Sequence, residues 1–330
     1  KTKKGSIFHT GDWKIDPNPM VGKPIDEDVL SKIKKDGIDT MVCDSTNVFN
    51  ENPSGSEKEV REKFRDIFMN FQSGKIVVTC FASNIARLET ILKIAGEFQR
   101  SCVLLGRSLI RIYESAIENN LLINETNIIS EKDARYFSDE NLVLICTGSQ
   151  GESRASLSRI INRSHKFFHL SKKDLVIFSS REIPGNEKPI NELKAQISKV
   201  GCRILDHTTK NVHVSGHPSK DELVDMYSYI KPKISIPVHG TREHIDAHAE
   251  LAHKCQVPKI IKPKNGDVIK LNGSSPSVIS KIDFVNHVYD AGEIVPVNNE
   301  RFTVRRHSLW NGFVSVSVVI NEEGYLVAPP

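Results

Sequence analysis

No two cysteines of this sequence are spaced as CxxC. The six cysteines are scattered, and five of them lie in or beside apolar, strand-sized segments, while Cys255 ends a helical one. Zinc ribbons and disulfide frameworks need cysteines at short or regular spacings, so this distribution argues against both. We predict that the cysteines are small buried side chains of a protein in the reducing cytoplasm.

The sequence also has no apolar run long enough to span a membrane. The longest runs, GKIVVTCFA and NLVLICTG, have the length of strands. The first residues lack the pattern of a secretory signal and no initiator Met precedes them, so we expect a piece of a longer protein with no membrane partner. The net charge of +4 permits a nucleic-acid partner without requiring one.

Short apolar runs alternate with helical patterns through the middle of the chain. The runs lie at 74–81, 101–106, 140–148, 173–180, 211–216 and 233–240. This alternation predicts a largely parallel sheet with helices on both faces. Before the first run, Ser56 and Glu59 have the spacing of a capping box and begin a predicted helix.

The pattern changes after about residue 268. NGSSPS is typical of a loop, and residues 313–330, FVSVSVVINEEGYLVAPP, alternate with period two around the turn NEEG. That alternation predicts a β-hairpin. We therefore expect a second, small domain to begin in this part of the chain.

Ligands of α/β proteins bind beyond the carboxyl ends of the strands, so polar residues at the predicted strand ends are site candidates. Asp44 in CDSTN ends one strand, although an Asx or Ser turn is the favoured explanation when this residue is taken alone. Ser83 and Asn84 in FASN lie at a helix start, where they cap the helix or bind a phosphate. The glycines of TGSQGE, residues 147–152, fit a tight turn or a close approach to a ligand.

Histidines occur at two further turns. His213 and His217 lie on either side of a Ser-Gly turn, and His239 lies at a predicted strand end before Gly240. A neutral imidazole at such a place is suited to metal binding. His244 and His248 in HIDAH have helical i, i+4 spacing, but we interpret them as a solvated helix face, and HKFFH (165–169) as a loop.

The segment IFHTGDWKID, residues 7–16, adds an acid near a strand end. His9 and Asp12 are three residues apart, which is typical of part of a metal site. Asp12 has no obvious second ligand nearby in the sequence, so any partners must come from distant segments.

Seven motifs occur in a characteristic order: HTGDWKIDPNP, DSTN, TCFASNIARLE, TGSQGE, IPGNE, VHVSGH and PVHGTREH. With them the chain resembles ribonuclease J, a bacterial family of the metallo-β-lactamase superfamily with the β-CASP insertion. The resemblance implies an α/β fold. A partial metallo-β-lactamase αββα core (1–55 and 206–268) would be interrupted by a β-CASP α/β domain (56–205), and a small C-terminal α+β domain would begin at 269–330.

The resemblance also implies roles for individual residues. Asp12 matches a carboxylate that bridges two metal ions, and His239 a histidine that binds metal, as in the RNA-cutting members. Asp44 and His217 match the catalytic acid and histidine motifs. His217 would protonate the leaving oxygen, and Asp44 would orient the His217 ring. His9 is expected to support the loop. The segments that would hold the RNA backbone are Phe81, Ala82, Ser83 and His213, Val214, Ser215, Gly216, His217.

The implied activity is that of a metal-dependent ribonuclease. It would act as a 5′–3′ exonuclease and endonuclease on single-stranded RNA, in rRNA processing and mRNA decay, with two divalent ions, zinc or manganese. The full-length protein would form dimers or tetramers. The HxHxDH motif of the family is absent from these residues. We therefore expect the remaining metal ligands to precede residue 1 and the chain alone to be inactive.

Two other interpretations remain open from the sequence. One is a hydrolase of the same superfamily that acts on DNA or on a small ester. The other is a non-catalytic RNA-binding subunit whose metal site has been lost.

Overall fold

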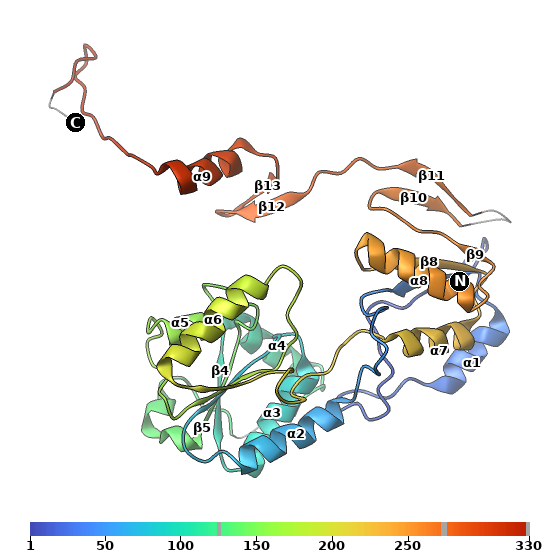
Figure 1. Cartoon of the computed structure of the whole chain (residues 1–330), viewed down its shortest axis with the longest axis horizontal. Helices are drawn as coiled ribbons and strands as arrows, with labels where there is room; N and C mark the ends of the chain where they lie inside the picture. Colours follow the sequence, from blue (N-terminus) through green and yellow to red (C-terminus); the bar gives the residue numbers. More distant parts are fainter. Residues whose placement is uncertain (124–126, 272–275, 328–330) are drawn as a thin grey trace. The chain divides into compact units, whose positions relative to one another are not determined.

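The computed structural model describes residues 1–123, 127–271 and 276–327. The chain forms two compact units, of which the larger consists mainly of Lys1–Pro263 and the smaller lies after it. Figure 1 shows the elements along the chain. Among the described residues, no helix combines the length and apolar character needed to cross a bilayer.

A five-stranded, all-parallel sheet forms one part of the larger unit. Its strands lie in the order β4, β5, β3, β6, β7. They are β3 (Ile76–Thr79), β4 (Ser101–Leu105), β5 (Leu142–Cys146), β6 (Leu175–Phe178) and β7 (Arg203–Leu205). This confirms the parallel sheet that the alternating apolar runs predict.

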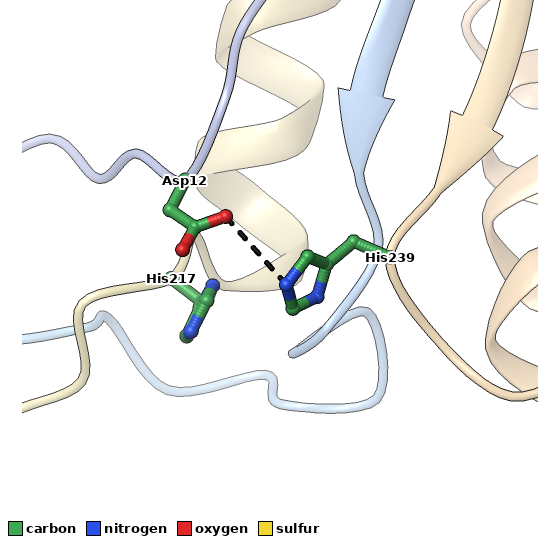
Figure 2. Close-up of side chains that lie close together, drawn as sticks. All are labelled: Asp12, His217 and His239. Carbon is green, nitrogen blue, oxygen red and sulfur yellow. Dashed lines mark ion pairs between the residues drawn. The ribbon is translucent and has the colours of Figure 1, made fainter. Parts of the chain in front are cut away.

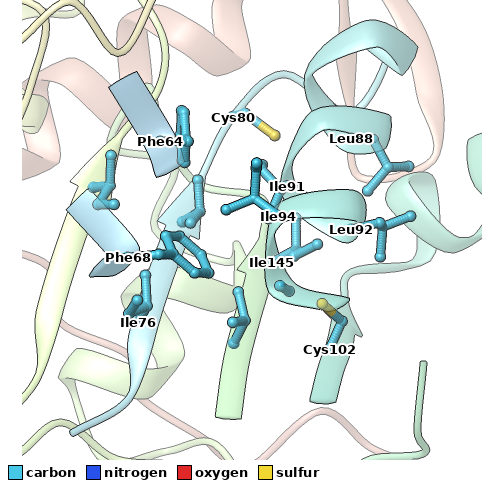
Figure 3. Packing of buried hydrophobic residues seen from close by; sticks show 14 of the residues in the cluster. Phe64, Phe68, Ile76, Cys80, Leu88, Ile91, Leu92, Ile94, Cys102 and Ile145 are labelled. Atoms are coloured by element: carbon cyan, nitrogen blue, oxygen red, sulfur yellow. The ribbon is translucent and has the colours of Figure 1, made fainter. Parts of the chain in front are cut away.

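Helices cover both faces of this sheet, as expected for strands whose residues are mostly apolar. Successive side chains of a strand point to opposite faces, so Ile76 and Val78 enter one apolar cluster and Val77 the other. The first cluster, part of which Figure 3 shows, is completed by α2 (Glu57–Met69), α3 (Ile85–Glu97) and α4 (Arg107–Glu118). The second is completed by α5 (Ser156–Ile161) and α6 (Glu187–Val200). Two short 3₁₀ helices, Asp133–Tyr136 and Asp139–Asn141, precede β5.

The predicted start of α2 is confirmed. Ser56 is the N-cap, and its hydroxyl accepts from the N–H of Lys58. The apolar positions that the helical spacing marks, Val60, Phe64 and Phe68, are at most 1% exposed.

Residues 211–216 do not form the strand that their apolar pattern predicts. The carbonyl of Val212 accepts from the Ser179 hydroxyl (2.7 Å) and from Nη1 of Arg87 (3.0 Å). Because side chains satisfy this buried carbonyl, the segment needs no neighbouring strand. It is an extended loop instead.

A four-stranded, all-parallel sheet forms the other part of the larger unit, in the order β1, β2, β8, β9. The strands are β1 (Ile7–His9), β2 (Thr40–Asp44), β8 (Ile234–Val238) and β9 (Lys259–Ile260). Three helices pack with β2 in a single apolar cluster, which includes Met41 and Cys43. They are α1 (Glu27–Asp36), α7 (Lys220–Ile230) and α8 (Arg242–Lys254).

The smaller unit contains two antiparallel pairs, a helix and an extended segment. The pairs are β10 (Asp267–Lys270) with β11 (Ser277–Lys281), and β12 (His287–Asp290) with β13 (Glu293–Pro296), and the helix is α9 (Glu300–Asn311). In the predicted hairpin of residues 313–330, one antiparallel bridge joins Ile320 to Leu326 around the turn. No regular strand forms in its described residues, which are exposed and have no face to bury. Residues 328–330, and most of the predicted NGSSPS loop, lie outside the described residues.

The cysteines behave as the sequence predicts. Among the described residues no disulfide joins them, and all but the half-buried Cys255 are buried. Burial raises the pKa of Cys43 to about 12 and that of Cys80 to about 11, so both stay protonated.

A buried arginine links the helices of the five-stranded sheet to the extended loop. Arg87, in the first turn of α3, is 0% exposed. Its guanidinium donates to both carboxylate oxygens of Glu57 (2.9 and 3.1 Å), to the carbonyl and hydroxyl of Ser179, and to the Val212 carbonyl. Such a buried pair is strongly destabilising when only one partner is removed.

We predict that Arg87→Met lowers the free energy of unfolding by about 3–5 kcal/mol, because Glu57 and the Val212 carbonyl lose their donor. Urea unfolding followed by circular dichroism measures this. The control is Arg65→Met, which breaks the pair of Arg65 with Glu97, whose side chains are 42% and 36% exposed. The control should cost less than about 1 kcal/mol, and equal losses in the two variants would contradict the prediction.

Candidate functional site

Three neighbouring parallel strands end at the same edge of the four-stranded sheet. The register pairs His9 of β1 with Val42 of β2, and Asp44 of β2 with Val238 of β8. The residues at or just after these ends therefore lie close together, although they are far apart in sequence. They include Asp12, Asp44 and His239.

The side chain of His217 lies close to those of Asp12 and His239. One ligand atom from each of the three lies within 4.8 Å of the others. Figure 2 shows them pointing toward one another from three separate segments. Nε2 of His239 is 3.7 Å from a carboxylate oxygen of Asp12, and both side chains are more than half exposed. Asp12 and His239 offer one oxygen and one nitrogen donor that fit a divalent metal such as zinc, and a nitrogen of His217 lies close to both.

The carboxylate of Asp44 is 1% exposed and lies behind these three residues. It is 2.7 Å from Nδ1 of His217, and its other oxygen accepts from the N–H (2.9 Å) and hydroxyl (2.6 Å) of Thr46. Burial raises the pKa of Asp44, but the hydrogen bonds from His217 and Thr46 outweigh burial and hold it below the usual value. The same bond to Asp44 raises the pKa of His217.

Two residues of the site were not predicted individually, although both belong to the DSTN motif. The hydroxyl of Thr46 is 2.7 Å from Nδ1 of His239, which leaves Nε2 of that ring facing Asp12. The amide of Asn47 donates to the Ser215 hydroxyl (2.7 Å) and to the His217 carbonyl (3.1 Å). The sequence signal that could have identified both residues is the contiguous polar motif DSTN, residues 44–47.

The backbone of His239 has a left-handed conformation, with φ of 60°. Histidine tolerates this region better than most side chains, but few residues other than glycine adopt it. The turn directs the His239 imidazole toward Asp12 immediately after β8 ends.

The segment IFHTGDWKID, residues 7–16, contributes Asp12 to the site, and its His9 and Asp16 support the surrounding chain. His9 accepts a hydrogen bond from the N–H of Gly11 at Nδ1 (3.0 Å), so it supports the loop around Asp12. Asp16 is 8% exposed and accepts from the N–H groups of Asn18 and Glu57. Asp16 therefore orders the chain between the two sheets.

A cleft of about 1090 Å³ adjoins the site. His217 and His239 lie at its wall, together with the other residues of the 213–217 loop, and with Phe81 and Ser83 after β3. Ala82 does not line the cleft and packs partly buried against the apolar cluster. Two exposed cations also line it, Lys23 and Arg181, and no pattern in the sequence had marked them.

His213 contributes a buried nitrogen to this cleft. Its Nδ1 has no hydrogen-bond partner among the described residues. Burial, with the nearby Arg87 as second cause, lowers the pKa of His213 to about 3, so the ring is neutral. A buried polar atom without a partner is rare and is expected where a ligand supplies the missing bond.

At the other candidate turns, packing explains the sequence. Asn84 is the N-cap of α3 and accepts from the N–H of Arg87, while the Ser83 side chain is exposed. Gly151 has φ of 78°, and a Cβ there would lie 2.6 Å from the backbone carbon of Pro189. The TGSQGE turn is therefore shaped by its contact with α6.

The interpretation of HIDAH as a solvated face is wrong for His248. The first histidine, His244, is half-buried, and His248 is 0% exposed. Helical spacing shows which residues share a face, but it does not show what packs against that face. HKFFH is a loop between α5 and β6, as predicted.

Two family models match the chain. The model described as "Ribonuclease J, beta-CASP domain" matches residues 73–197, and the one described as "Zn-dependent metallo-hydrolase RNA specificity domain" matches residues 205–262.

Curated relatives match over nearly the whole chain. A protein named ribonuclease J from Sinorhizobium meliloti is 36% identical over 333 residues, which cover 100% of this chain and 58% of the relative. Another from Mycolicibacterium smegmatis is 34% identical over 323 residues, which cover 97% of this chain and 58% of the relative. This chain belongs to the ribonuclease J family.

The two matched regions contain different residues of the site in this member of the ribonuclease J family. The first model includes Phe81 and Ser83, and the second includes His217 and His239. Asp12 and Asp44 lie outside both models. The chain spans only 58% of the length of each of these two relatives.

A solved structure shares the fold at low sequence identity. A crystal structure from Enterococcus faecalis V583, titled as a protein of unknown function, superposes with a TM-score of 0.52 at 13% identity. It covers 80% of this chain and 58% of the other chain. This likeness supports the arrangement of the two parallel α/β sheets. The two family models make that arrangement consistent with the metallo-β-lactamase and β-CASP fold.

The pair of Asp44 with His217 predicts a stability maximum at mildly acidic pH in metal-free protein. The pKa of His217 is raised above 6.5 in the folded protein. Its contribution to the free energy of unfolding is therefore complete below about pH 6.5 and is lost as the pH rises through the folded-state pKa. The pKa of Asp44 is lowered below 3.8, so its contribution is present above about pH 3.8 and is lost on acidification through the folded-state pKa.

We therefore expect Asp44→Asn to lower the unfolding free energy most between about pH 4 and pH 6.5, and less at pH 9. Urea unfolding of both proteins, with a chelator present, measures the difference at each pH. A difference that stays constant from pH 4 to pH 9 would show that the pair does not titrate as the geometry implies.

Proposed function

We propose that the protein is a metal-dependent ribonuclease with 5′–3′ exonuclease and endonuclease activity, acting in rRNA processing and mRNA decay. The observation that carries this proposal is the convergence of Asp12, His217 and His239 beside a large cleft. The family membership and the match to an RNA specificity domain support RNA as the substrate.

Asp12 and His239 would hold the metal, zinc or manganese, with Asp12 bridging two ions. The His239 ring offers Nε2, since Nδ1 is engaged by Thr46, and such a partner fixes the ring orientation of a metal ligand. A bound divalent ion lowers the pKa of water and neutralises negative charge on a phosphate.

His217 would protonate the leaving oxygen of the cleaved phosphodiester. Asp44 holds Nδ1 of this ring at 2.7 Å, so Nε2 is the nitrogen available to the substrate. The raised pKa of His217 keeps a proton on the ring closer to neutral pH, which a general acid requires. Asp44 orients the ring and stabilises its protonated form.

The cleft would bind the RNA backbone. The hydroxyls of Ser83 and Ser215, the Ser215–Gly216 turn and the exposed Arg181 present donors for phosphates, and Phe81 presents an aromatic face for a base. Of the other residues in these segments, Val214 would shape the wall of the cleft, whereas Ala82 packs against the apolar cluster and would support the segment without touching RNA. The size of the cleft and its position beside His217 suit a single strand of RNA. Entry of this strand by its 5′ end is part of the proposal.

We also propose the domain division expected from the sequence: 1–55 and 206–268 as one interrupted core, 56–205 as the inserted domain and 269–330 as the beginning of a further one. In support, β3 to β7 all fall within 56–205, while β1, β2, β8 and β9 fall in the two flanking pieces. A cytoplasmic location and a dimeric or tetrameric full-length protein complete the proposal.

Replacing His217 separates its proposed role from metal binding. In the protein expressed from its complete coding sequence, His217→Ala should lower kcat on RNA by roughly 10²–10⁴-fold, because the proton donor is lost. The metal content measured by elemental analysis should be unchanged. Loss of a metal ion in this variant would mean that His217 is a ligand instead.

Replacing Asp12 tests the metal site itself. Asp12→Ala should lose at least one bound ion per chain and almost all ribonuclease activity, because a bridging carboxylate is removed. The exposed His169 provides the control, since His169→Ala should retain both metal and activity. A full metal complement in Asp12→Ala would contradict the bridging role.

Replacing Arg181 tests the RNA path. Arg181→Ala should weaken binding of a single-stranded RNA and reduce the slope of log affinity against log salt by roughly 0.7, the value for one lost phosphate contact. Arg163→Ala, at an exposed arginine outside the cleft, should leave the slope unchanged. Identical slopes for the two variants would place the RNA elsewhere.

A further inference from the structure

A row of buried polar side chains lies behind the site, on the side of α7 and α8. Ser45 follows Asp44, and its hydroxyl is 2.8 Å from Nδ1 of His248. Nε2 of His248 is 2.9 Å from the hydroxyl of Tyr227, which is 2.7 Å from the hydroxyl of Ser235. Tyr227 is 3% exposed, and the other three side chains are 0% exposed.

This row connects the core of the sheet to the strand end. His248 lies on α8, Tyr227 on α7 and Ser235 on β8. The rings of Tyr227 and His248 meet edge to face, with centroids 5.7 Å apart. The contacts between hydroxyls and the imidazole run without interruption from Ser235, near the start of β8, to Ser45, just after the end of β2, so each group orients the next.

Ser45 stands between the two residues that hold the site histidines. Asp44, before it, accepts from His217, and Thr46, after it, contacts His239. The N–H of Ser45 donates to the Val238 carbonyl (2.9 Å), which ties the end of β2 to the end of β8. The His248 contact fixes the side chain of the same residue, so Ser45 is held by both backbone and side chain.

We propose that His248 is a positioning residue of the active site. It fixes Ser45, and through Ser45 it fixes the carboxylate and the hydroxyl that orient His217 and His239. The kinetic part of this proposal rests on the proposed ribonuclease function.

Packing alone does not require a histidine at this place. The surrounding cluster is apolar and includes Met41, Cys43 and Leu223. A buried imidazole is costly unless both nitrogens are hydrogen-bonded, and an aliphatic side chain would fill the space without that requirement. Fully satisfied buried networks instead select one geometry among several, which is what a site needs. Burial lowers the pKa of His248 to about 4, so the ring remains neutral and passes on a defined hydrogen bond.

The test replaces His248 in the protein expressed from its complete coding sequence. His248→Leu removes both hydrogen bonds and should lower kcat on single-stranded RNA by roughly 10- to 100-fold, as for residues that orient a ligand from behind. KM should stay within twofold, because the cleft is untouched. His248→Asn, which can still reach Ser45, should recover most of the loss.

The same two replacements at His253 are the matched control. His253 lies on the same helix and is exposed, so both of its variants should keep the wild-type kcat. The proposal would be overturned by equal kcat values for His248→Leu and His253→Leu. It would also be overturned if His248→Leu changed only the melting temperature.

A double variant tests the path through Ser45. If His248 acts through that hydroxyl, Ser45→Ala combined with His248→Leu should lower kcat no further than the more severe single variant. Effects that multiply would show that His248 acts by another route, and the proposed path would be wrong.

A crystal structure of each variant gives a readout that does not depend on catalysis. In His248→Leu the separation of the Asp44 carboxylate from Nδ1 of His217, 2.7 Å in the wild type, should lengthen. In His253→Leu it should not. If the wild-type protein cuts no RNA, the proposed function fails, while an unchanged separation in His248→Leu would by itself overturn the positioning role.

Discussion

The contact between Asp44 and His217 is the interaction on which the arrangement of the site depends. Asp44 belongs to the four-stranded sheet, whereas His217 belongs to a loop that returns from the five-stranded sheet. Their 2.7 Å contact brings together positions 173 residues apart. Asp44 also holds Thr46, which in turn orients His239. A single buried carboxylate thus sets the directions of two imidazoles, and its own burial makes both bonds strong because water does not compete for them.

Arg87 has the corresponding role for the other side of the cleft. It is fully buried, and it connects α2, the end of β6 and the carbonyl of Val212. The loop that carries His213 and His217 follows directly. Since that loop pairs with no strand in the described part of the chain, its position depends on side-chain donors, of which Arg87 supplies one and Ser179 another. The cleft is therefore shaped by polar contacts on a frame of two apolar sheets.

The sequence predicted some of these features for physical reasons and missed others. The period and length of the apolar runs identified the strands, and parallel strands end at one edge of a sheet. This made it possible to find Asp12, Asp44 and His239. His217 was also singled out, at the turn after the apolar run 211–216, but that run is a loop in the structure and not the predicted strand. Thr46 and Asn47 act through tertiary contacts that spacing does not encode. The burial of His248 was not predicted because helical spacing does not show what packs against a helix face. Arg181 was not predicted because the cleft that it lines is formed by segments far apart in the sequence.

His239 also bears on how far this protein could be stabilised. A residue other than glycine with φ of 60° gives up roughly 1–2 kcal/mol of backbone energy to direct its ring. Glycine at this position would recover that energy and would remove the imidazole at the same time. A search for stabilising substitutions, guided by backbone geometry alone, would therefore be drawn to the residue whose loss the site could least tolerate. The conformational cost at His239 marks a position where selection for thermal stability and selection for the proposed metal site would act in opposite directions.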